Sequence, residues 1–218
     1  MAKPKGKVTI RWSSEFAYAI GLITTDGNLS PDGRHISFTS KDLELIKNLH
    51  RGLGIENFIG KKARGGEKEK KYFVTQFSDI LFYRFLVSIG LMSDKSLRIK
   101  EVLVPDEYFF DFLRGHFDGD GTFYSYWDPR WKASFLFYTT FVSASKKHVD
   151  WLQKKVQLLL GISGHRTTSG AEHVIYQIKY AKNDSFLLLQ HIYPTPDVLC
   201  LKRKHLKIIK AFSILLKP

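Results

Sequence analysis

Two aspartates stand at the ends of similar apolar segments. Asp26 and Asp120 are each followed by a glycine, and each comes five residues after another glycine, Gly21 or Gly115. Both segments have the length of helices, so both carboxylates are expected at helix C-termini, where the helix dipole disfavours negative charge by about 0.3–1 kcal/mol. Two such carboxylates at close range need a counter-charge, and a hard cation with oxygen ligands, Mg²⁺ above all, supplies it. A phosphodiester bound there would be open to metal-assisted hydrolysis.

The spacing of small residues predicts that the two segments pack against each other. Gly21 and Thr25 are four residues apart, as are Gly115 and Gly119, so each pair falls on one face of a helix. Faces of this kind let two helix backbones approach closely. If the helices lie side by side, the two aspartates meet at one end of the interface.

The two segments also begin two copies of a longer unit. Equivalent features recur in the same order: the Asp-Gly pairs are 94 positions apart, Ser40 and Ser145 are 105 apart, and Lys95 and Lys204 are 109 apart. Each copy is predicted to run α-β-β-α-β-β-α, with modest insertions in the second. The chain is therefore expected to be an α+β protein with pseudo-twofold duplication, an N-terminal half at residues 1–105 and a C-terminal half at residues 106–218.

The charge of the chain favours nucleic acid as the partner. Lys and Arg number 34 against 21 Asp and Glu, a formal net charge of +13 that is shared by both halves. A basic surface spread over a folded body suits a phosphate backbone. Rings and cations also alternate in stretches that resemble strands, and a β-ribbon of that kind can lie in a DNA groove.

Composition excludes several other classes of protein. The single Cys200 cannot form an internal disulfide or a cysteine zinc site. No apolar run reaches the ~18–20 residues that span a bilayer, and the N-terminus has no apolar stretch typical of a signal peptide. We therefore expect no membrane partner and an intracellular protein, in the cytoplasm or nucleoid or in an organellar matrix, that is not secreted.

The two aspartate segments carry a family resemblance. Residues 19–27 (AIGLITTDG) and 113–121 (LRGHFDGDG) resemble the two copies of the LAGLIDADG motif of monomeric homing endonucleases. The resemblance implies two antiparallel saddle-shaped sheets, with the two motif helices at the central interface. It assigns the eighth motif residue as the metal-binding catalytic acid, and the third and seventh residues as interface positions. These map onto Asp26 and Asp120 as acids, and onto Gly21, Thr25, Gly115 and Gly119 at the interface. The first copy departs at its sixth position, where Thr24 stands opposite Asp118 of the second copy.

The resemblance implies a site-specific double-strand DNA endonuclease acting in intron homing. Such an enzyme cuts a long asymmetric target across the minor groove as a monomer, leaves short 3′ overhangs and uses Mg²⁺, with Mn²⁺ or Ca²⁺ as possible substitutes. The family also uses basic residues around the metals, and the repeat places Lys95 and Lys204 there, with Lys202 as an alternate. An RNA-splicing maturase, which would bind RNA, or a non-cleaving DNA-binding protein of the same fold stays open as an alternative.

Residues of the basic strands and hairpins are the expected contacts to double-stranded DNA. The second copy has a longer first hairpin, so its half-site contacts should differ from those of the first. The candidates are Arg34, His35, Ser37, Ser40, Lys61, Arg64, Lys68, Tyr72, Tyr124, Tyr126, Arg130, Lys132, Ser145, Arg166, Thr168 and Lys179.

Overall fold

The computed structural model describes residues 6–63 and 68–215 of the chain. The first half consists of α1 (Ser14–Asp26), β1 (Gly27–Leu29), β2 (His35–Ser40), α2 (Leu43–Leu53), β3 (Ile59–Lys62), β4 (Tyr72–Ser78) and α3 (Ile80–Ser88). The second half consists of α4 (Phe109–Asp120), β5 (Thr122–Trp127), β6 (Phe135–Ser143), α5 (Lys146–Leu160), β7 (His165–Ser169), β8 (Ile175–Tyr180), α6 (Lys182–Ile192) and α7 (Lys202–Leu215).

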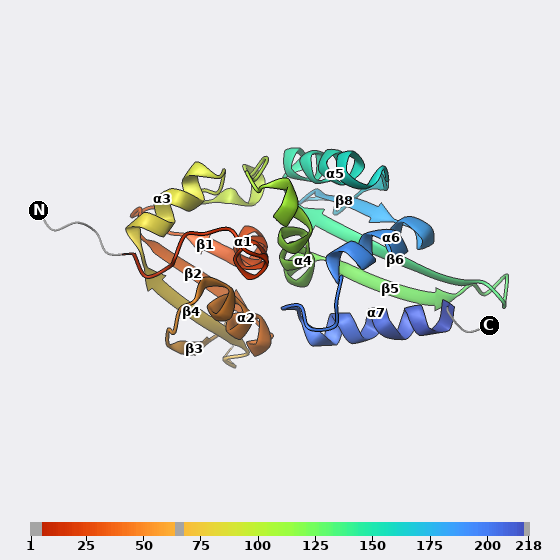
Figure 1. Cartoon of the computed structure of the whole chain (residues 1–218), viewed down its shortest axis with the longest axis horizontal. Coiled ribbons are helices and arrows are strands. Elements are labelled where there is room, and N and C mark those ends of the chain that lie inside the picture. Colours follow the sequence, from red (N-terminus) through yellow and green to blue (C-terminus); the bar gives the residue numbers. More distant parts are fainter. Residues whose placement is uncertain (1–5, 64–67, 216–218) are drawn as a thin grey trace, which may run out of the picture.

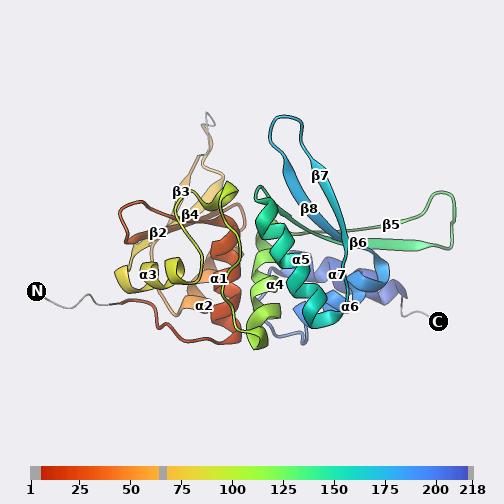
Figure 2. The ribbon, with the colours of Figure 1, turned by 90° about the horizontal axis from the view of Figure 1, so that it is seen from above.

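Each half contains one four-stranded antiparallel sheet. The strand orders are β1-β2-β4-β3 and β5-β6-β8-β7, which is the same order in the two copies. The predicted α+β duplication is confirmed. The motif helices α1 and α4 lie side by side at the centre, and the sheets extend outward from them (Figures 1 and 2).

The motif helix α1 is apolar on nearly every side because it packs on its own sheet and on α4. Residues 16–24 are all buried. The helix begins at Ser13, whose hydroxyl accepts a hydrogen bond from the backbone N–H of Phe16 at 3.1 Å, as an N-cap residue should. Its partner α4 begins at Phe109, after one 3₁₀ turn at Asp106–Tyr108.

Gly27 ends α1 without the left-handed backbone that is common after a helix C-terminus. Its backbone is extended (φ −78°, ψ 150°), and the chain passes directly into β1. A Cβ at this position would lie 2.6 Å from the carbonyl oxygen of Ile23, and a Cβ on Gly121 would lie equally close to that of Phe117. Glycine is therefore needed here for close approach to the helix rather than for a positive φ.

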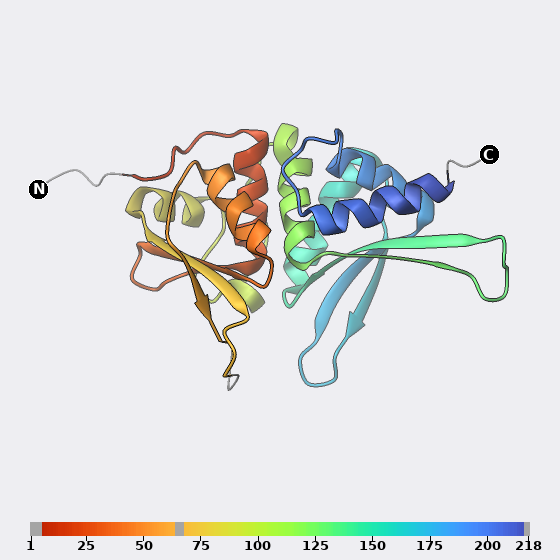
Figure 3. The same ribbon diagram turned by 90° about the horizontal axis from the view of Figure 1, so that it is seen from below.

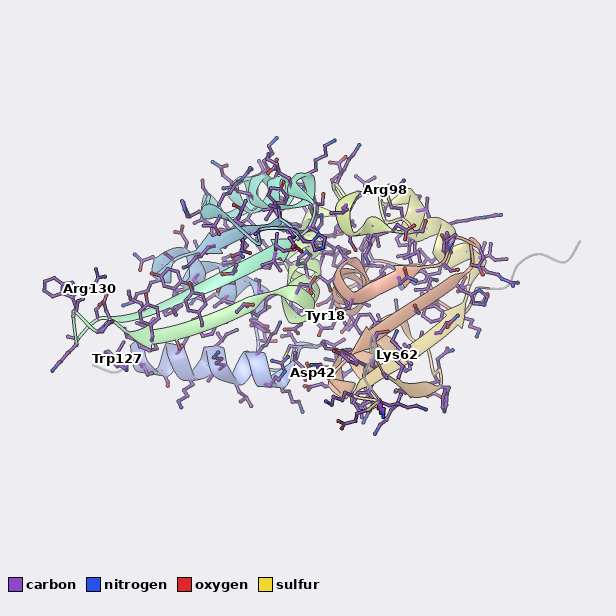
Figure 4. The ribbon with its side chains drawn as sticks, turned by 180° about the vertical axis from the view of Figure 1, so that it is seen from behind. Tyr18, Asp42, Lys62, Arg98, Trp127 and Arg130 are labelled. Carbon is purple, nitrogen blue, oxygen red and sulfur yellow. The ribbon has the colours of Figure 1, made fainter. Side chains whose placement is uncertain are left out.

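Alternation along the strands separates a covered face from an open face in each sheet. In β2, Ile36 and Phe38 are buried under the helices, while the neighbours of alternate parity are only partly buried. Phe137 of β6 is likewise buried and contacts Phe212 of α7, with 6.0 Å between ring centroids. The helices thus cover one face of each sheet and leave the other face open (Figure 4).

The pairing of Ser40 with Ser145 between the two copies is corrected by the structure. Asp42 and Ser145 are the N-cap residues of α2 and α5. Two residues earlier, the hydroxyls of Ser40 and Ser143 each accept a hydrogen bond, at 3.1 Å, from the backbone N–H of the N-cap residue. Ser40 is therefore equivalent to Ser143. The sequence comparison slipped by two residues because a Ser-Lys pair occurs at both places.

Two additions distinguish the second half from the first. The hairpin of β5 and β6 extends far from the centre as an arm (Figure 3). The helix α7 follows α6 and packs along the covered side of β5 and β6. The first half has a single 3₁₀ turn at Lys95–Leu97 where the second half has the start of α7.

Candidate active site

The interface between α1 and α4 is built on two glycines. A Cβ on Gly21 would lie 2.1 Å from the carbonyl oxygen of Phe112, and a Cβ on Gly115 would lie 2.0 Å from that of Tyr18. Neither position can accept a side chain without separating the helices, because real Cβ atoms do not approach backbone oxygen that closely. The structure therefore places Gly21 and Gly115 directly in the helix contact.

Close helix packing brings the two aspartates to one end of the interface. Asp26 and Asp120 are the last residues of α1 and α4. A Cβ on Gly119 would lie 2.0 Å from Oγ1 of Thr25 and 3.2 Å from Oδ2 of Asp26. The Asp26 carboxylate thus lies against the residue that precedes Asp120. Thr25 and Gly119 contact each other at the C-terminal ends of the two helices, and Gly21 and Gly115 lie in the middle of the helix contact.

Two lysines lie at the same ends of the two helices. Nζ of Lys95 donates to the carbonyl oxygens of Thr25 and Gly27. Nζ of Lys204 donates to the carbonyl oxygens of the corresponding residues Gly119 and Gly121, the latter at 2.6 Å. The last carbonyls of a helix have no intrahelical partner and carry the negative end of the dipole. The lysines therefore neutralise helix ends that also carry carboxylates.

These four side chains, Asp26, Asp120, Lys95 and Lys204, form what we call the Asp–Lys cluster. Burial lowers the pKa of Lys95 to about 8, an effect that Asp26 and Asp120 partly offset. Burial also lowers the pKa of Lys204 to about 8, and Asp118, Asp120 and Asp26 partly offset it. The repeat-based prediction named this pair of lysines, and the structure brings both to the aspartates. Lys202, the alternate, is exposed in the first turn of α7.

Asp120 is exposed at the end of α4 and lines an open cavity. The loss of hydration raises the pKa of Asp120, and the nearby charges of Lys204 and Lys95 oppose that rise. A carboxylate in this state gains free energy when a further cation neutralises it.

Two cavities open on either side of the motif helices. One, of about 490 Å³, is lined by Asp120 and Lys95 together with His116, Ser143 and His148. The other, of about 530 Å³, is lined by Asp26 and Gly119 together with residues of the first half, among them Ser40, Lys41, Lys62 and Tyr72. Each of the two aspartates thus lines one of the two cavities.

The sequence analysis did not predict a structural role for Asp118, a buried carboxylate next to the site. Asp118 is fully buried and accepts hydrogen bonds from the hydroxyls of Tyr18 and Tyr193, each at 2.9 Å, and from the backbone N–H of Leu201 at 2.6 Å. Burial raises its pKa, and the hydrogen bonds oppose the rise. The Tyr18 contact crosses between the halves, so Asp118 connects α1, α4 and the segment that precedes α7.

The open face of the first sheet holds some of the predicted DNA contacts. Ser37 pairs with Gln76, and Lys62 pairs with Tyr72, all on the open face. Lys62 was missed by the sequence analysis, which chose Lys61 instead. The side chain of Lys61 points to the opposite face, where Nζ lies 5.4 Å from the ring centroid of Phe73.

The other first-half candidates lie around the same sheet. His35 shares the parity of Ser37 and contacts Asp32, which also pairs with exposed Arg34 at 3.5 Å. Lys68 is exposed beyond β3. Arg64 lies outside the described residues.

Three candidates in the second half are placed away from the open face. Ser145 is buried, and its hydroxyl donates to the carbonyl oxygen of Ile99. Arg166 pairs with buried Ile178 on the covered face and forms an ion pair with Asp150 of α5 at 2.5 Å. Thr168 has the same parity as Arg166. We correct these three predictions, because side chains on the helix side are not available to a partner on the open face.

The remaining second-half candidates form an aromatic surface on the open face. The rings of Tyr124 and Tyr126 stack on Tyr138 with centroid distances of 5.1 and 6.3 Å. Nζ of Lys179 lies 4.0 Å from the ring centroid of Tyr138 and 5.0 Å from that of Tyr124. Arg130, which pairs with Asp128, and Lys132 lie in the exposed tip of the arm; Figure 4 labels Arg130 there.

The donor set of the site fits a hard divalent cation that shares its coordination with a substrate. The two carboxylates offer oxygen ligands at one spot, which is what Mg²⁺ or Ca²⁺ prefers. The described residues contain no group of three or more histidine, cysteine, aspartate or glutamate side chains able to hold a metal on their own. Phosphate oxygens and water would have to complete the coordination sphere.

Comparison with known proteins finds a family model that matches the first half of the chain. Residues 13–90 match the family model described as a LAGLIDADG-like domain, and residues 106–215 repeat its topology with the second motif helix in the equivalent place. Residues 13–90 are therefore a LAGLIDADG-like domain, and the second half repeats its fold. No curated protein sequence matches it.

Several solved structures share this LAGLIDADG fold. The crystal structure of I-DmoI in complex with DNA and Ca superimposes with a TM-score of 0.58 at 16% identity, covering 90% of this chain and 97% of that chain. I-SmaMI bound to uncleaved DNA target in the presence of calcium ions gives a TM-score of 0.58 at 13% identity and covers 94% and 91%. The N-terminal LAGLIDADG domain of DUF199/WhiA gives 0.53 at 16% identity and covers 86% and 85%.

These neighbours show the LAGLIDADG fold of the chain. They do not show its activity, which has to be argued from the residues of the site. I-DmoI is named a homing endonuclease, whereas the DUF199/WhiA domain is described without a nuclease activity.

Within the described residues, no helix is long and apolar enough to cross a membrane.

Proposed function

We propose that the protein is a divalent-metal-dependent DNA endonuclease that cuts both strands of a long, asymmetric duplex site. The observation that carries the proposal is the Asp–Lys cluster, with two carboxylates and two lysines of lowered pKa at the ends of paired helices. By family likeness the cut crosses the minor groove and leaves short 3′ overhangs. Mg²⁺ is the expected metal, with Mn²⁺ or Ca²⁺ able to occupy the site.

The residues of the cluster have distinct tasks in this proposal. Asp26 and Asp120 hold the metal, which when bound would supply Lewis-acid charge at the scissile phosphates. Lys95 and Lys204 supply fixed positive charge beside the developing negative charge, each from a helix end where its Nζ is held by backbone carbonyls. Since the two motif helices are related by a pseudo-twofold, one lysine faces each strand of an antiparallel duplex.

The open faces provide affinity and specificity. The first half presents small polar side chains such as Ser37 and Gln76, whereas the second presents Tyr124, Tyr138 and Lys179. Because these sets differ in size and charge, the two half-sites should differ in sequence. An asymmetric target suits a single chain with two unlike halves.

A non-cleaving DNA-binding protein of the same fold is the second candidate. The likeness to the DUF199/WhiA domain favours it, since that neighbour shares the fold without being described as a nuclease. Against it stands the cost of placing two carboxylates where a phosphate backbone would bind, a cost that a binding protein has no reason to keep. No comparison supports the RNA alternative.

Selection of cleavable duplexes from a randomised library with Mg²⁺ tests the proposal. Wild-type protein should recover one long asymmetric site with 3′ overhangs, and Asp120→Asn should recover none. Tight binding of a duplex without cutting by the wild type would instead establish the binding protein.

A further inference from the structure

The segment that carries Lys204 is anchored on the opposite half of the molecule. Immediately before this lysine, Arg203 of α7 donates from Nη2 and Nε to the carboxylate of Asp42, at 2.7 and 3.0 Å. The backbone N–H of Lys202 donates to Oε2 of Glu44 at 3.2 Å. Both acceptors belong to the start of α2 in the first half. Figure 4 shows Asp42 beside the beginning of α7.

A buried contact extends this anchor along α2. Nδ2 of Asn48 donates to the carbonyl oxygen of Cys200 at 2.8 Å, and Asn48 is only 8% exposed. One residue later, the carbonyl oxygen of Leu201 accepts hydrogen bonds from the backbone N–H groups of Lys204 and His205 at 3.0 and 3.1 Å. The first turn of α7 is thus held at its start by the first half.

The segment that carries Lys95 is anchored in the reverse direction. The hydroxyl of Ser145, at the start of α5 in the second half, donates to the carbonyl oxygen of Ile99. Nδ1 of His148 contacts the carbonyl oxygen of Lys100 at 2.6 Å. The backbone N–H of Ile99 in turn donates to the carbonyl oxygen of Lys95 at 2.8 Å. The 3₁₀ turn that presents Lys95 is therefore fixed by the second half.

Asp42 and Ser145 stand at equivalent positions, and neither performs the usual task of its position. Each is the N-cap residue of its helix, yet neither side chain caps that helix. Asp and Ser are among the residues most favoured for capping a helix N-terminus. Both side chains are turned instead to the lysine-bearing segment of the other half.

We infer that Asp42 and Ser145 are positioning residues that form a reciprocal clamp, each holding in place the site lysine of the opposite half. The inference rests on the proposed function, since it assigns one lysine to each scissile phosphate. With this clamp, the rate of each strand cut depends on its own contact between the two halves. A change in one contact therefore alters the rate of one cut. Loss of one anchor should slow one strand cut and leave the other close to its normal rate.

Plasmid cleavage separates strand-specific effects from general ones. On a supercoiled plasmid bearing the target, wild type should pass to linear product with little nicked intermediate. Asp42→Ala and Ser145→Ala should each slow one cut by about 10-fold or more, a rate ratio that corresponds to about 1.4 kcal/mol in the barrier. Nicked circles should accumulate, with opposite strands cut by the two variants. Asp106→Ala, which removes an exposed ion pair with Lys155 away from the cluster, is the matched control and should resemble wild type.

A charge swap and hydrogen exchange complete the test. Asp42→Arg combined with Arg203→Asp restores an ion pair and should recover the slow strand cut. In the protein without DNA, Asp42→Ala should speed amide exchange in residues 200–205, and Ser145→Ala in residues 95–100, with the motif helices unchanged.

The outcomes distinguish the clamp from the proposed function. If wild type cuts no duplex, the proposed function fails, and the strand-specific role of the clamp falls with it. If wild type cuts but each variant slows both strands equally, or neither strand, the clamp is overturned while the nuclease stands. Unchanged exchange in both segments would overturn the anchoring itself, whatever the activity.

Discussion

Lys95 and Lys204 occupy equivalent positions in the two halves, each donating from Nζ to the first backbone carbonyl beyond a motif helix, that of Gly27 or Gly121. They arrive there on different elements, since Lys95 begins a 3₁₀ turn and Lys204 lies in the first turn of a 14-residue helix. The duplication has kept the charge at the helix end while changing the element that delivers it. Because both halves keep a lysine beside the aspartate, we infer that the lysines act together with the aspartates.

The helix contact predicts a large effect of small substitutions. Gly21→Ala or Gly115→Ala places a Cβ about 2 Å from backbone oxygen of the opposite helix. The helices must separate, so the free energy of unfolding should fall by at least about 2 kcal/mol. Urea unfolding measures the change. The matched control is Gly6→Ala, where an added Cβ would meet only ordinary contacts of 3.5 Å or more. Equal effects of all three substitutions would contradict the packing described.

The buried lysines predict a dependence of stability on pH. The pKa of each lysine is 10.5 ordinarily and about 8 in the folded protein. Below pH 8 both the folded and unfolded chains keep the proton, so the cost of burying the charge is fully present. Between about pH 8 and 10.5 the unfolded chain binds more protons, and the lysines therefore make stability rise with pH. Comparison of urea midpoints across this range should show a flatter rise in Lys95→Met and Lys204→Met than in wild type. An identical slope in all three proteins would show that the lysines are not desolvated.

Asp120 predicts opposite responses with and without a divalent cation. The raised pKa of Asp120 means that ionisation of this carboxyl is less favourable in the folded protein than in the unfolded chain. Asp120→Asn removes that charge, so the metal-free variant should melt above wild type. Ca²⁺ binds the folded state and should raise the melting temperature of wild type more than that of the variant. Thermal melts with EDTA and with Ca²⁺ measure both effects. A variant that responds to Ca²⁺ as strongly as wild type would remove Asp120 from the metal site.

Two neighbouring lysines test which face of the first sheet meets DNA. Lys62 shares the open face with Tyr72, whereas Lys61 lies over the ring of Phe73 on the other face. Lys62→Ala should weaken DNA binding and reduce the slope of log K against log salt by about 1, the value for one lost phosphate contact. Lys61→Ala should leave both nearly unchanged. The reverse ranking in a salt titration would mean that the duplex lies against the helices.

Local patterns sufficed to predict the centre of the molecule. The aspartates and interface glycines belong to short segments whose spacing determines their place on a helix, and the repeat transferred that logic to Lys95 and Lys204. The strand residues that face DNA were harder to predict from the sequence. Side chains alternate between the two faces of a sheet, so a one-residue error places a side chain on the wrong face. Lys61 and Arg166 were misplaced in this way. Asp118 was noticed only as a departure between the motifs, since its hydrogen bonds to Tyr18, Tyr193 and Leu201 depend on tertiary contacts.

Single-turnover cutting of a selected duplex measures whether Asp26 and Asp120 carry out metal-dependent cleavage. In Mg²⁺, wild type should cut both strands, and EDTA should stop the reaction. Asp26→Asn and Asp120→Asn should each lower the rate by about 10³-fold or more, as expected when several kcal/mol of transition-state stabilisation are lost, while DNA affinity stays within about threefold. Cleavage by either variant at close to the wild-type rate would show that its aspartate does not hold the catalytic metal.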